Sequence, residues 1–231
     1  MKAMVLAAGL GRRLRPLTDE LPKALVPIRG IPILEIVIRR LMRAGVDQLI
    51  VNTHHLSDQV ESFLSQAGFG VPITLSHEDD LLETGGGLKH ASWFFDDGRP
   101  FFVHNADVLS SIDLERMYRF HEENGALATL AVSQRPSPRR LFFDKNDRLL
   151  SSERTKAQSL AFNGIHVVSP RIFPLMSESG AFSITQTYLR LAGVGQAIQA
   201  FRTDEYFCTD IGTPDKLEKA QSWAAPRDQK Y

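Results

Sequence analysis

Apolar residues along the chain follow two patterns, short continuous runs and longer stretches that repeat every three or four residues. The stretch Ile33 to Ala44 shows the second pattern, with Val37 and Leu41 on its apolar face and Gly45 as its stop, so it predicts an amphipathic helix. Runs typical of buried strands occupy residues 3–8, 48–52, 71–75, 100–104, 126–133, 160–169, 197–201 and 206–210.

The remaining helices are expected between these runs, each opened by a residue that can cap it. The expected N-caps are Ser57, Asp113, Ser183, which begins the capping box Ser-Ile-Thr-Gln, and Thr213. Strands and helices alternate in the first third of the chain, which predicts a parallel sheet with helices on its faces. A hairpin is expected at 141–150, and the strand at 160–169 is interrupted by Asn163-Gly164.

The bulk composition fits one large α/β domain. The chain has 231 residues, 43% of them apolar, and we expect a single domain over 1–225 with halves meeting near residue 110 and a tail at 226–231. Lys plus Arg and Asp plus Glu number 27 each, so neither a nucleic-acid nor a membrane surface is indicated. The single cysteine, Cys208, excludes an internal disulfide, and no apolar stretch is long enough to span a membrane, so we expect a cytoplasmic protein.

A glycine turn with cations follows the first apolar run. Gly9 and Gly11 let backbone N–H groups approach an oxyanion without a Cβ in the way. The cations that follow are Arg12, Arg13, Arg15 and Lys23, a mixture suited to a polyphosphate. The dinucleotide fingerprint would need glycine where Leu14 stands, and no P-loop sequence occurs. An ordinary turn with solvated arginines is the alternative.

Two carboxylates stand at the ends of apolar runs. Asp107 follows the run at 100–104, and Asp210 ends the last run. Ligands of open α/β sheets bind at such strand ends, and Mg²⁺ prefers oxygen ligands with several retained waters. The pair is a candidate Mg²⁺ site, and strand-end capping is the alternative.

A run of glycines leads into another expected helix. The sequence Glu83-Thr84-Gly85-Gly86-Gly87 leaves the first N–H groups of that helix bare, which allows a flat ring to lie against the backbone. A purely structural glycine turn is the alternative.

The segment from Leu6 to Thr18, LAAGLGRRLRPLT, and the following Pro22-Lys23-Ala24-Leu25 resemble the signature of sugar-1-phosphate nucleotidyltransferases. The resemblance covers nearly the whole chain. It implies a three-layer α/β/α, Rossmann-like (GT-A-like) fold with a mostly parallel mixed central sheet, a nucleotide-binding first half and a sugar-binding second half. It also implies attack of a sugar 1-phosphate on the α-phosphorus of a nucleoside triphosphate, giving an NDP-sugar and pyrophosphate. We expect a monomer or a homodimer.

The resemblance also implies roles for individual residues. The implied catalytic residues are Arg13, Lys23, Asp107 and Asp210, with both aspartates on Mg²⁺. The implied nucleotide contacts are Ala7, Ala8, Gly9, Gly11, Glu78, Gly86 and Asn105. The implied sugar contacts are Glu83, Asn163, Gly164 and Lys156.

Three positions depart from the family pattern. Ala106 stands for the glycine of N-G-D, and Cys208 stands for the tryptophan of W-x-D; we interpret this cysteine as a small buried hydrophobe, not a nucleophile. The E-K-P motif is missing, and Lys156 in the nearest stretch is the candidate substitute for its lysine.

The compact length and the Glu-Thr-Gly-Gly-Gly run are most similar to N-acetylmuramate-1-phosphate uridylyltransferases and short mannose-1-phosphate guanylyltransferases. We therefore expect UTP and N-acetylmuramate 1-phosphate, with another hexose 1-phosphate as the alternative. A non-catalytic module that senses nucleotide or sugar phosphate is a second class of function. A glycosyltransferase is a third, but it would usually show D-x-D where this chain has Asn105-Ala106-Asp107.

Overall fold

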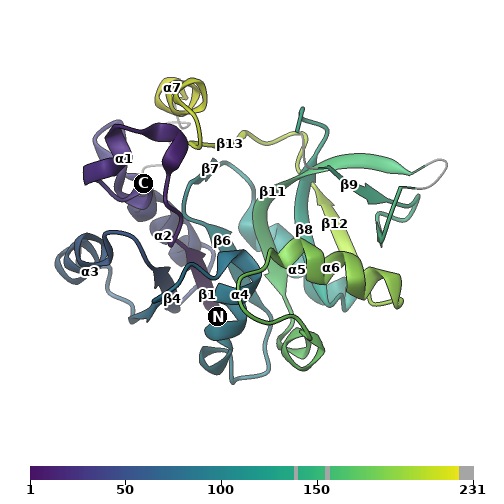
Figure 1. Ribbon diagram of the computed structural model, residues 1–231. Coiled ribbons are helices and arrows are strands. Elements are labelled where there is room, and N and C mark those ends of the chain that lie inside the picture. Colours follow the sequence, from purple (N-terminus) through teal and green to yellow (C-terminus); the bar gives the residue numbers. More distant parts are fainter. Residues whose placement is uncertain (138–139, 154–156, 224–231) are drawn as a thin grey trace.

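The computed structural model describes residues 1–137, 140–153 and 157–223, so Lys156 and the expected tail at 226–231 lie outside the described residues. Within those ranges no helix has the length and apolar character needed to cross a membrane. A mixed nine-stranded sheet runs through the molecule (Figure 1). Its main order is β10 (Leu149–Leu150), β9 (Arg140–Phe143), β11 (Gln158–Val168), β6 (Phe101–Asn105), β1 (Lys2–Leu6), β4 (Gln48–Thr53) and β5 (Ile73–His77), and β8 (Ala128–Ser133) pairs with β11 and with β12 (Ile198–Arg202).

The first half of the chain builds the parallel part of the sheet. Strand β1 pairs in parallel with β4 and β6, and β5 pairs in parallel with β4. The register sets Leu6 beside Asn52 of β4 and beside Asn105 of β6. The carboxyl ends of three strands therefore meet at one edge, which is where α/β sheets bind ligands.

Helices cover both faces of the sheet. Side chains alternate along a strand, so Ala3 and Val5 join the core on one face and Met4 joins the core on the other. The first face packs against α2 (Ile33–Arg43), α3 (Ser57–Gln66) and α5 (Leu114–Asn124). The second face packs against α4 (Glu83–His90) and α6 (Ile184–Gly193). These three layers confirm the expected α/β/α architecture.

The second half of the chain is organised by the long strand β11. It runs antiparallel to β6, β8 and β9, so antiparallel pairs gather here while parallel pairs surround β1. Its register with β8 shifts between Phe162 and His166, and Gly164 adopts a φ of 76° there. The expected interruption of this strand is therefore a β-bulge, which bends the strand next to the ligand edge.

A two-stranded ladder carries the second aspartate. Strand β13 (Cys208–Asp210) pairs antiparallel with β7 (Val108–Ser110), which places Asp210 opposite Val108, and the N–H of Ile211 donates to the carbonyl of Asp107 at 2.9 Å. Helix α7 (Pro214–Ser222) follows. The remaining short elements are β2 (Pro27–Ile28), β3 (Ile31–Pro32), α1 (Leu17–Glu20) and the 3-10 helices η1 (Arg12–Leu14), η2 (Lys23–Leu25), η3 (Ser92–Phe94) and η4 (Pro170–Leu175).

Only one of the four expected N-caps makes the expected bond. Asp113 accepts a hydrogen bond from the N–H of Arg116 at 2.8 Å, as predicted. The capping box is wrong, because the Ser183 hydroxyl pairs with that of Thr185 and the first N–H of α6 donates to Thr84 of α4 at 3.0 Å. Ser57 and Thr213 make no side-chain capping bond to their helices.

Candidate active site

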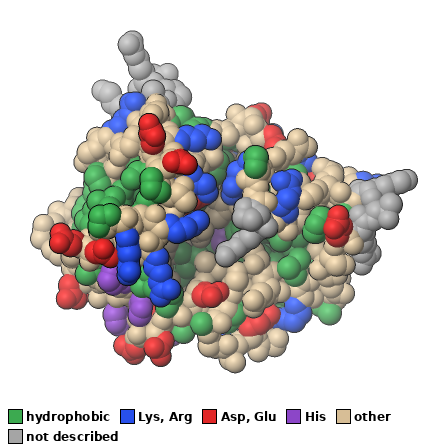
Figure 2. Space-filling model, turned by 45° about the horizontal axis from the view of Figure 1, so that its top comes forward, with side chains coloured by type: hydrophobic (Ala, Val, Ile, Leu, Met, Phe, Trp, Pro, Cys, Tyr) green, Lys and Arg blue, Asp and Glu red, His purple; other side chains and the backbone are tan. Residues whose placement is uncertain are grey.

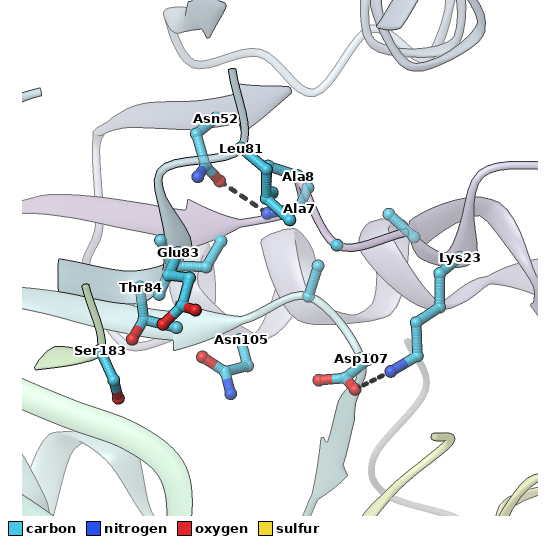
Figure 3. Close-up of a pocket in the computed structure, with 14 residues that line it drawn as sticks. Ala7, Ala8, Lys23, Asn52, Leu81, Glu83, Thr84, Asn105, Asp107 and Ser183 are labelled. Carbon is cyan, nitrogen blue, oxygen red and sulfur yellow. Dashed lines mark hydrogen bonds and ion pairs between the residues drawn. The ribbon is translucent and has the colours of Figure 1, made fainter. Parts of the chain in front are cut away.

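A cleft of about 320 Å³ opens where β1 and β6 end (Figure 3). Seven residues expected to contact substrates line it: Ala7, Ala8, Gly9, Lys23, Glu83, Asn105 and Asp107. Leu6, Ala24, Asn52, Leu81, Thr84, Ala106 and Ser183 complete the lining. In Figure 2 several Lys and Arg side chains gather about the middle of the face that carries these strand ends.

The glycine loop has one residue fixed by packing and one left open. Gly11 adopts a φ of 64°, and a Cβ there would lie 2.8 Å from the methyl carbon of Thr18, whose hydroxyl donates to the Gly11 carbonyl at 2.9 Å. No atom lies within 4 Å of a Cβ placed on Gly9. The turn at Gly11 therefore requires glycine, whereas the open space at Gly9 lets a ligand approach the backbone.

A buried polar network supports this loop from below. Asn52 accepts a hydrogen bond from the N–H of Ala7 at 2.7 Å and donates to Glu78 Oε1 at 2.6 Å. Glu78 Oε2 accepts from the N–H of Leu82 at 2.9 Å, and the Glu78 residue is only 2% exposed. Its carboxylate is thus occupied inside the protein, and its expected role at the nucleotide becomes one of support.

The glycine run of α4 is explained by close packing. A Cβ on Gly85 would lie 2.4 Å from the Phe182 ring, and one on Gly86 would lie 2.4 Å from the Gly180 carbonyl. A Cβ on Gly87 would lie 2.5 Å from Glu78 Oε1. All three glycines are buried, so Gly86 does not line the cleft and the structural alternative accounts for the run. Glu83, which starts the helix, is exposed and holds a φ of 58°.

Each of the two expected metal ligands forms an ion pair with a lysine, and of these two pairs Lys23–Asp107 lines the cleft while Lys216–Asp210 does not. Lys23 binds Asp107 Oδ2, and Lys216 binds Asp210 Oδ2. Asp210 Oδ1 accepts a third bond, from the N–H of Gly212 at 2.9 Å. Burial by itself would raise the pKa of Asp210. The bonds from Lys216 and Gly212, together with the charge of Lys23, outweigh burial and hold this pKa below its usual range.

Arg13 reaches this centre from η1. Its side chain is exposed, and its Nη2 lies 2.8 Å from the position that a Cβ of Gly212 would take. The absence of a side chain at Gly212 therefore leaves room for the guanidinium beside the Asp210 segment. The structure thus brings Arg13, Asp107 and Asp210 toward one region.

The two bulge residues of β11 that were expected to contact the sugar do not line the cleft. Gly164 allows the Asn105 side chain to pack, because a Cβ there would lie 2.6 Å from Asn105 Nδ2. Asn163 is buried, and its amide donates to Thr203 and accepts from Arg135 Nε, both at 2.8 Å. Its side chain therefore holds Arg135 in place and has no free group for a sugar. Lys156 lies outside the described residues.

Cys208 lies just below the metal-site candidates and remains a thiol. The side chain is half-buried against the core, and burial raises its pKa to about 12. A thiol with that pKa carries almost no thiolate at neutral pH, which agrees with the interpretation as a packing residue.

Sequence reasoning missed several residues of the site: Asn52, Thr84, Arg135, Ser183 and Lys216. Asn52 had a usable signal, since it ends an expected parallel strand beside the first one. Arg135 and Lys216 had none, because each reaches the site through contacts with residues distant in the sequence.

Comparisons with known proteins agree on one family. The family described as nucleotidyl transferase matches residues 2–225. The chain is 30% identical over 225 residues to a D-glycero-alpha-D-manno-heptose 1-phosphate guanylyltransferase from Aneurinibacillus thermoaerophilus, covering 96% of this chain and 97% of the relative. It is 34% identical over 219 residues to an N-acetylmuramate alpha-1-phosphate uridylyltransferase from Caulobacter vibrioides, covering 84% and 85%.

A solved structure supports the fold. HddC from Yersinia pseudotuberculosis, complexed with GMP-PN, superposes with a TM-score of 0.77 at 22% identity, covering 95% of this chain and 97% of that one. The family match extends over nearly the whole chain, and the two relatives catalyse nucleotidyl transfer to sugar 1-phosphates by name. The chain therefore belongs to the nucleotidyl transferase family and is a sugar-1-phosphate nucleotidyltransferase.

Proposed function

We propose that the cleft transfers a uridylyl group from UTP to N-acetylmuramate 1-phosphate. The observation that carries the proposal is the convergence of Lys23 and two aspartates, Asp107 and Asp210, beside the open Gly9 backbone. The N-acetylmuramate uridylyltransferase relative at 34% identity supports this choice of substrates.

The reaction needs charge neutralisation more than a general base. A phosphate monoester loses its second proton near pH 6, so the sugar phosphate is already largely dianionic at neutral pH. One of its oxygens forms a bond to the α-phosphorus of UTP, the bond from that phosphorus to the β-phosphate oxygen breaks, and pyrophosphate leaves. The barrier comes from bringing two anions together, and fixed cations lower it.

The chain's own residues have separate tasks in this scheme. The backbone at Gly9 and the side chain of Arg13 hold the triphosphate and stabilise the departing pyrophosphate. Lys23, which lines the cleft, bridges the α-phosphate and the attacking phosphate. Glu83 and the backbone at Gly164 contact the sugar.

The two aspartates fit a Mg²⁺ ion. Asp107 directly precedes β7, and Asp210 pairs with Val108, the first residue of that strand; each aspartate side chain is 22% exposed. Two carboxylates plus waters and phosphate oxygens satisfy Mg²⁺, so the pair suffices without a third protein ligand. A Mg²⁺ ion held by Asp107 and Asp210 would neutralise charge on the nucleotide phosphates.

A guanylyl donor with a heptose or mannose 1-phosphate is the second candidate. The heptose-1-phosphate guanylyltransferase relative, which aligns over 97% of its own length, favours it. The same cations and carboxylates serve both reactions, since the difference lies only in the base and the sugar.

The test is pyrophosphate release by the purified protein with Mg²⁺. UTP, GTP, CTP, ATP and dTTP are each combined with the 1-phosphates of N-acetylmuramate, mannose, glucose and D-glycero-D-manno-heptose. The proposal expects the highest kcat/KM for UTP with N-acetylmuramate 1-phosphate. A higher value for GTP with mannose 1-phosphate or with the heptose 1-phosphate would replace it with the second candidate, and a higher value for any remaining pair would contradict both.

A further inference from the structure

Lys216 is a residue of α7 that no motif pointed to, yet it occupies the carboxylate of Asp210. Both oxygens of that carboxylate are engaged, Oδ2 by the Lys216 ammonium and Oδ1 by the N–H of Gly212. The Gly212 bond joins residues only two apart in the chain and is fixed by the backbone. Oδ2 is therefore the oxygen that a movement of one side chain can release.

The same arrangement recurs at the other aspartate. The Lys23 ammonium binds Asp107 Oδ2 (Figure 3). Each of the two carboxylates therefore carries an ammonium. A divalent cation that binds both aspartates would compete with these ammonium groups, because like charges held close together repel one another.

The two lysines differ in how easily each ammonium can be displaced from its aspartate. The Lys23 side chain is 15% exposed and lines the cleft, whereas the Lys216 side chain is 39% exposed. An ion pair with an exposed lysine is weak, since water and salt screen it. We therefore expect the Lys216 ammonium to be displaced before the Lys23 ammonium.

We propose that Lys216 is a positioning residue that occupies Asp210 until a polyphosphate arrives, and that it then moves to the phosphate as the carboxylate takes a divalent cation. This inference rests on the proposed function. The Asp210 carboxylate and the phosphates of the nucleotide compete for the Lys216 ammonium. Nucleotide that takes the ammonium frees the carboxylate for the metal, so the binding of metal and the binding of nucleotide favour each other. Such coupling is reciprocal by thermodynamic necessity.

The test compares Lys216→Met with Lys219→Met. Lys219 lies on the same helix, and its replacement changes the net charge by the same amount. Its ammonium lies over the Phe207 ring, 5.8 Å from the ring centroid, and the ammonium bound to Asp210 is that of Lys216. Free Mn²⁺ is measured by electron paramagnetic resonance during titration of each protein, without nucleotide and with saturating UTP. Asp210→Asn reports the loss of the metal ligand.

Without nucleotide, Lys216→Met is expected to bind Mn²⁺ about fivefold more tightly than wild type, because Mn²⁺ then no longer has to break a weak ion pair. Lys219→Met is expected to match wild type, and the gain in Mn²⁺ affinity on adding UTP is expected to shrink only in Lys216→Met. Equal Mn²⁺ affinities in the two lysine variants would overturn the role of Lys216. Equal affinities in wild type and Asp210→Asn would overturn the metal site itself, and with it this inference.

Discussion

Asn52 donates a hydrogen bond to Glu78 at 2.6 Å across the ends of two neighbouring strands, and this pair supports the glycine loop. The other end of the Asn52 amide holds the N–H of Ala7 at 2.7 Å. Both side chains are almost fully buried. Because every member of the network has a partner, it fixes the backbone of the loop before any ligand binds.

Replacing Gly87 with alanine tests this network. The new Cβ would lie 2.5 Å from Glu78 Oε1 and 2.9 Å from Asn52 Nδ2, and neither group can move without losing its partner. We expect a loss of about 1–3 kcal/mol in the free energy of unfolding and a higher KM for the nucleotide. Urea denaturation and steady-state kinetics measure the two effects.

Gly193→Ala is the matched control for that substitution. Gly193 ends α6, and its added Cβ would meet only Ser151, at 3.4 Å. Alanine favours helices over glycine by roughly 1 kcal/mol, so this variant is expected to be unchanged or slightly more stable. Equal stability losses in the two variants would contradict the special role of Gly87.

Replacing Asn163 with alanine tests the support of Arg135. The change removes the bond that the Thr203 hydroxyl accepts and the bond that Arg135 Nε donates, and we expect a loss of about 1–3 kcal/mol in stability. Each group keeps one other bond, to the carbonyl of Val132 and of Phe162 respectively. We expect the KM for the sugar 1-phosphate to rise more than the KM for the nucleotide. Asn124→Ala, on an exposed helix end, is the control and should alter neither KM. A rise confined to the nucleotide KM would show that Asn163 serves the other half of the cleft.

Three buried histidines make stability depend on pH. Burial lowers the pKa of His104 and His121 to about 4 and that of His166 to about 3. The unfolded chain takes up these protons below about pH 6.5 while the folded chain does not. Stability is therefore fully present above pH 6.5 and is lost as the pH falls toward 4, by on the order of 1–2 kcal/mol per histidine at pH 5.

Urea denaturation between pH 7.5 and pH 5 measures this loss. In His121→Asn the amide oxygen can replace the ring nitrogen that pairs with Thr129 at 2.9 Å, and the group no longer titrates. The slope of stability against pH should then be shallower than in wild type. A wild-type stability that stays flat down to pH 5 would contradict the buried, neutral state of these rings.

The Cys208 thiol should be unreactive towards alkylating agents in the folded protein. With its pKa raised to about 12, the thiol reacts through a thiolate that is hardly populated at pH 8. We expect alkylation by iodoacetamide to be slow in the native protein and rapid in urea, and Cys208→Ala to keep its turnover. Fast native alkylation that abolishes turnover would assign the thiol to the site.

The sequence predicted those parts of the fold that depend on local pattern. Apolar periodicity located α2 within one residue at its end, and strand polarity indicated which edge of the sheet binds ligands. The capping box failed because the Ser183 hydroxyl pairs with Thr185, while the first N–H of α6 donates to Thr84, about a hundred residues away. Caps of this kind depend on tertiary contacts that no local pattern contains.

The residues of the candidate site that lie at a strand end or in a glycine turn could be predicted from the sequence, as for Gly9, Asp107 and Asp210. The glycine run had two interpretations, and only the distances to Gly180 and Phe182 distinguish packing from base contact. Lys216 depends on the direction in which α7 leaves β13, which is a property of the assembled fold.

We infer that the Lys23–Asp107 end of the cleft performs nucleotidyl transfer. The most direct measurement is kcat/KM for pyrophosphate release by wild type, Asp107→Asn and Asp113→Asn, with the substrate pair that the panel selects. Asp107→Asn keeps the shape and removes the charge, so we expect a loss of about 10²–10³-fold. Asp113→Asn exchanges one good helix cap for another far from the cleft and should stay within about twofold of wild type. An Asp107→Asn variant as active as Asp113→Asn would contradict the account.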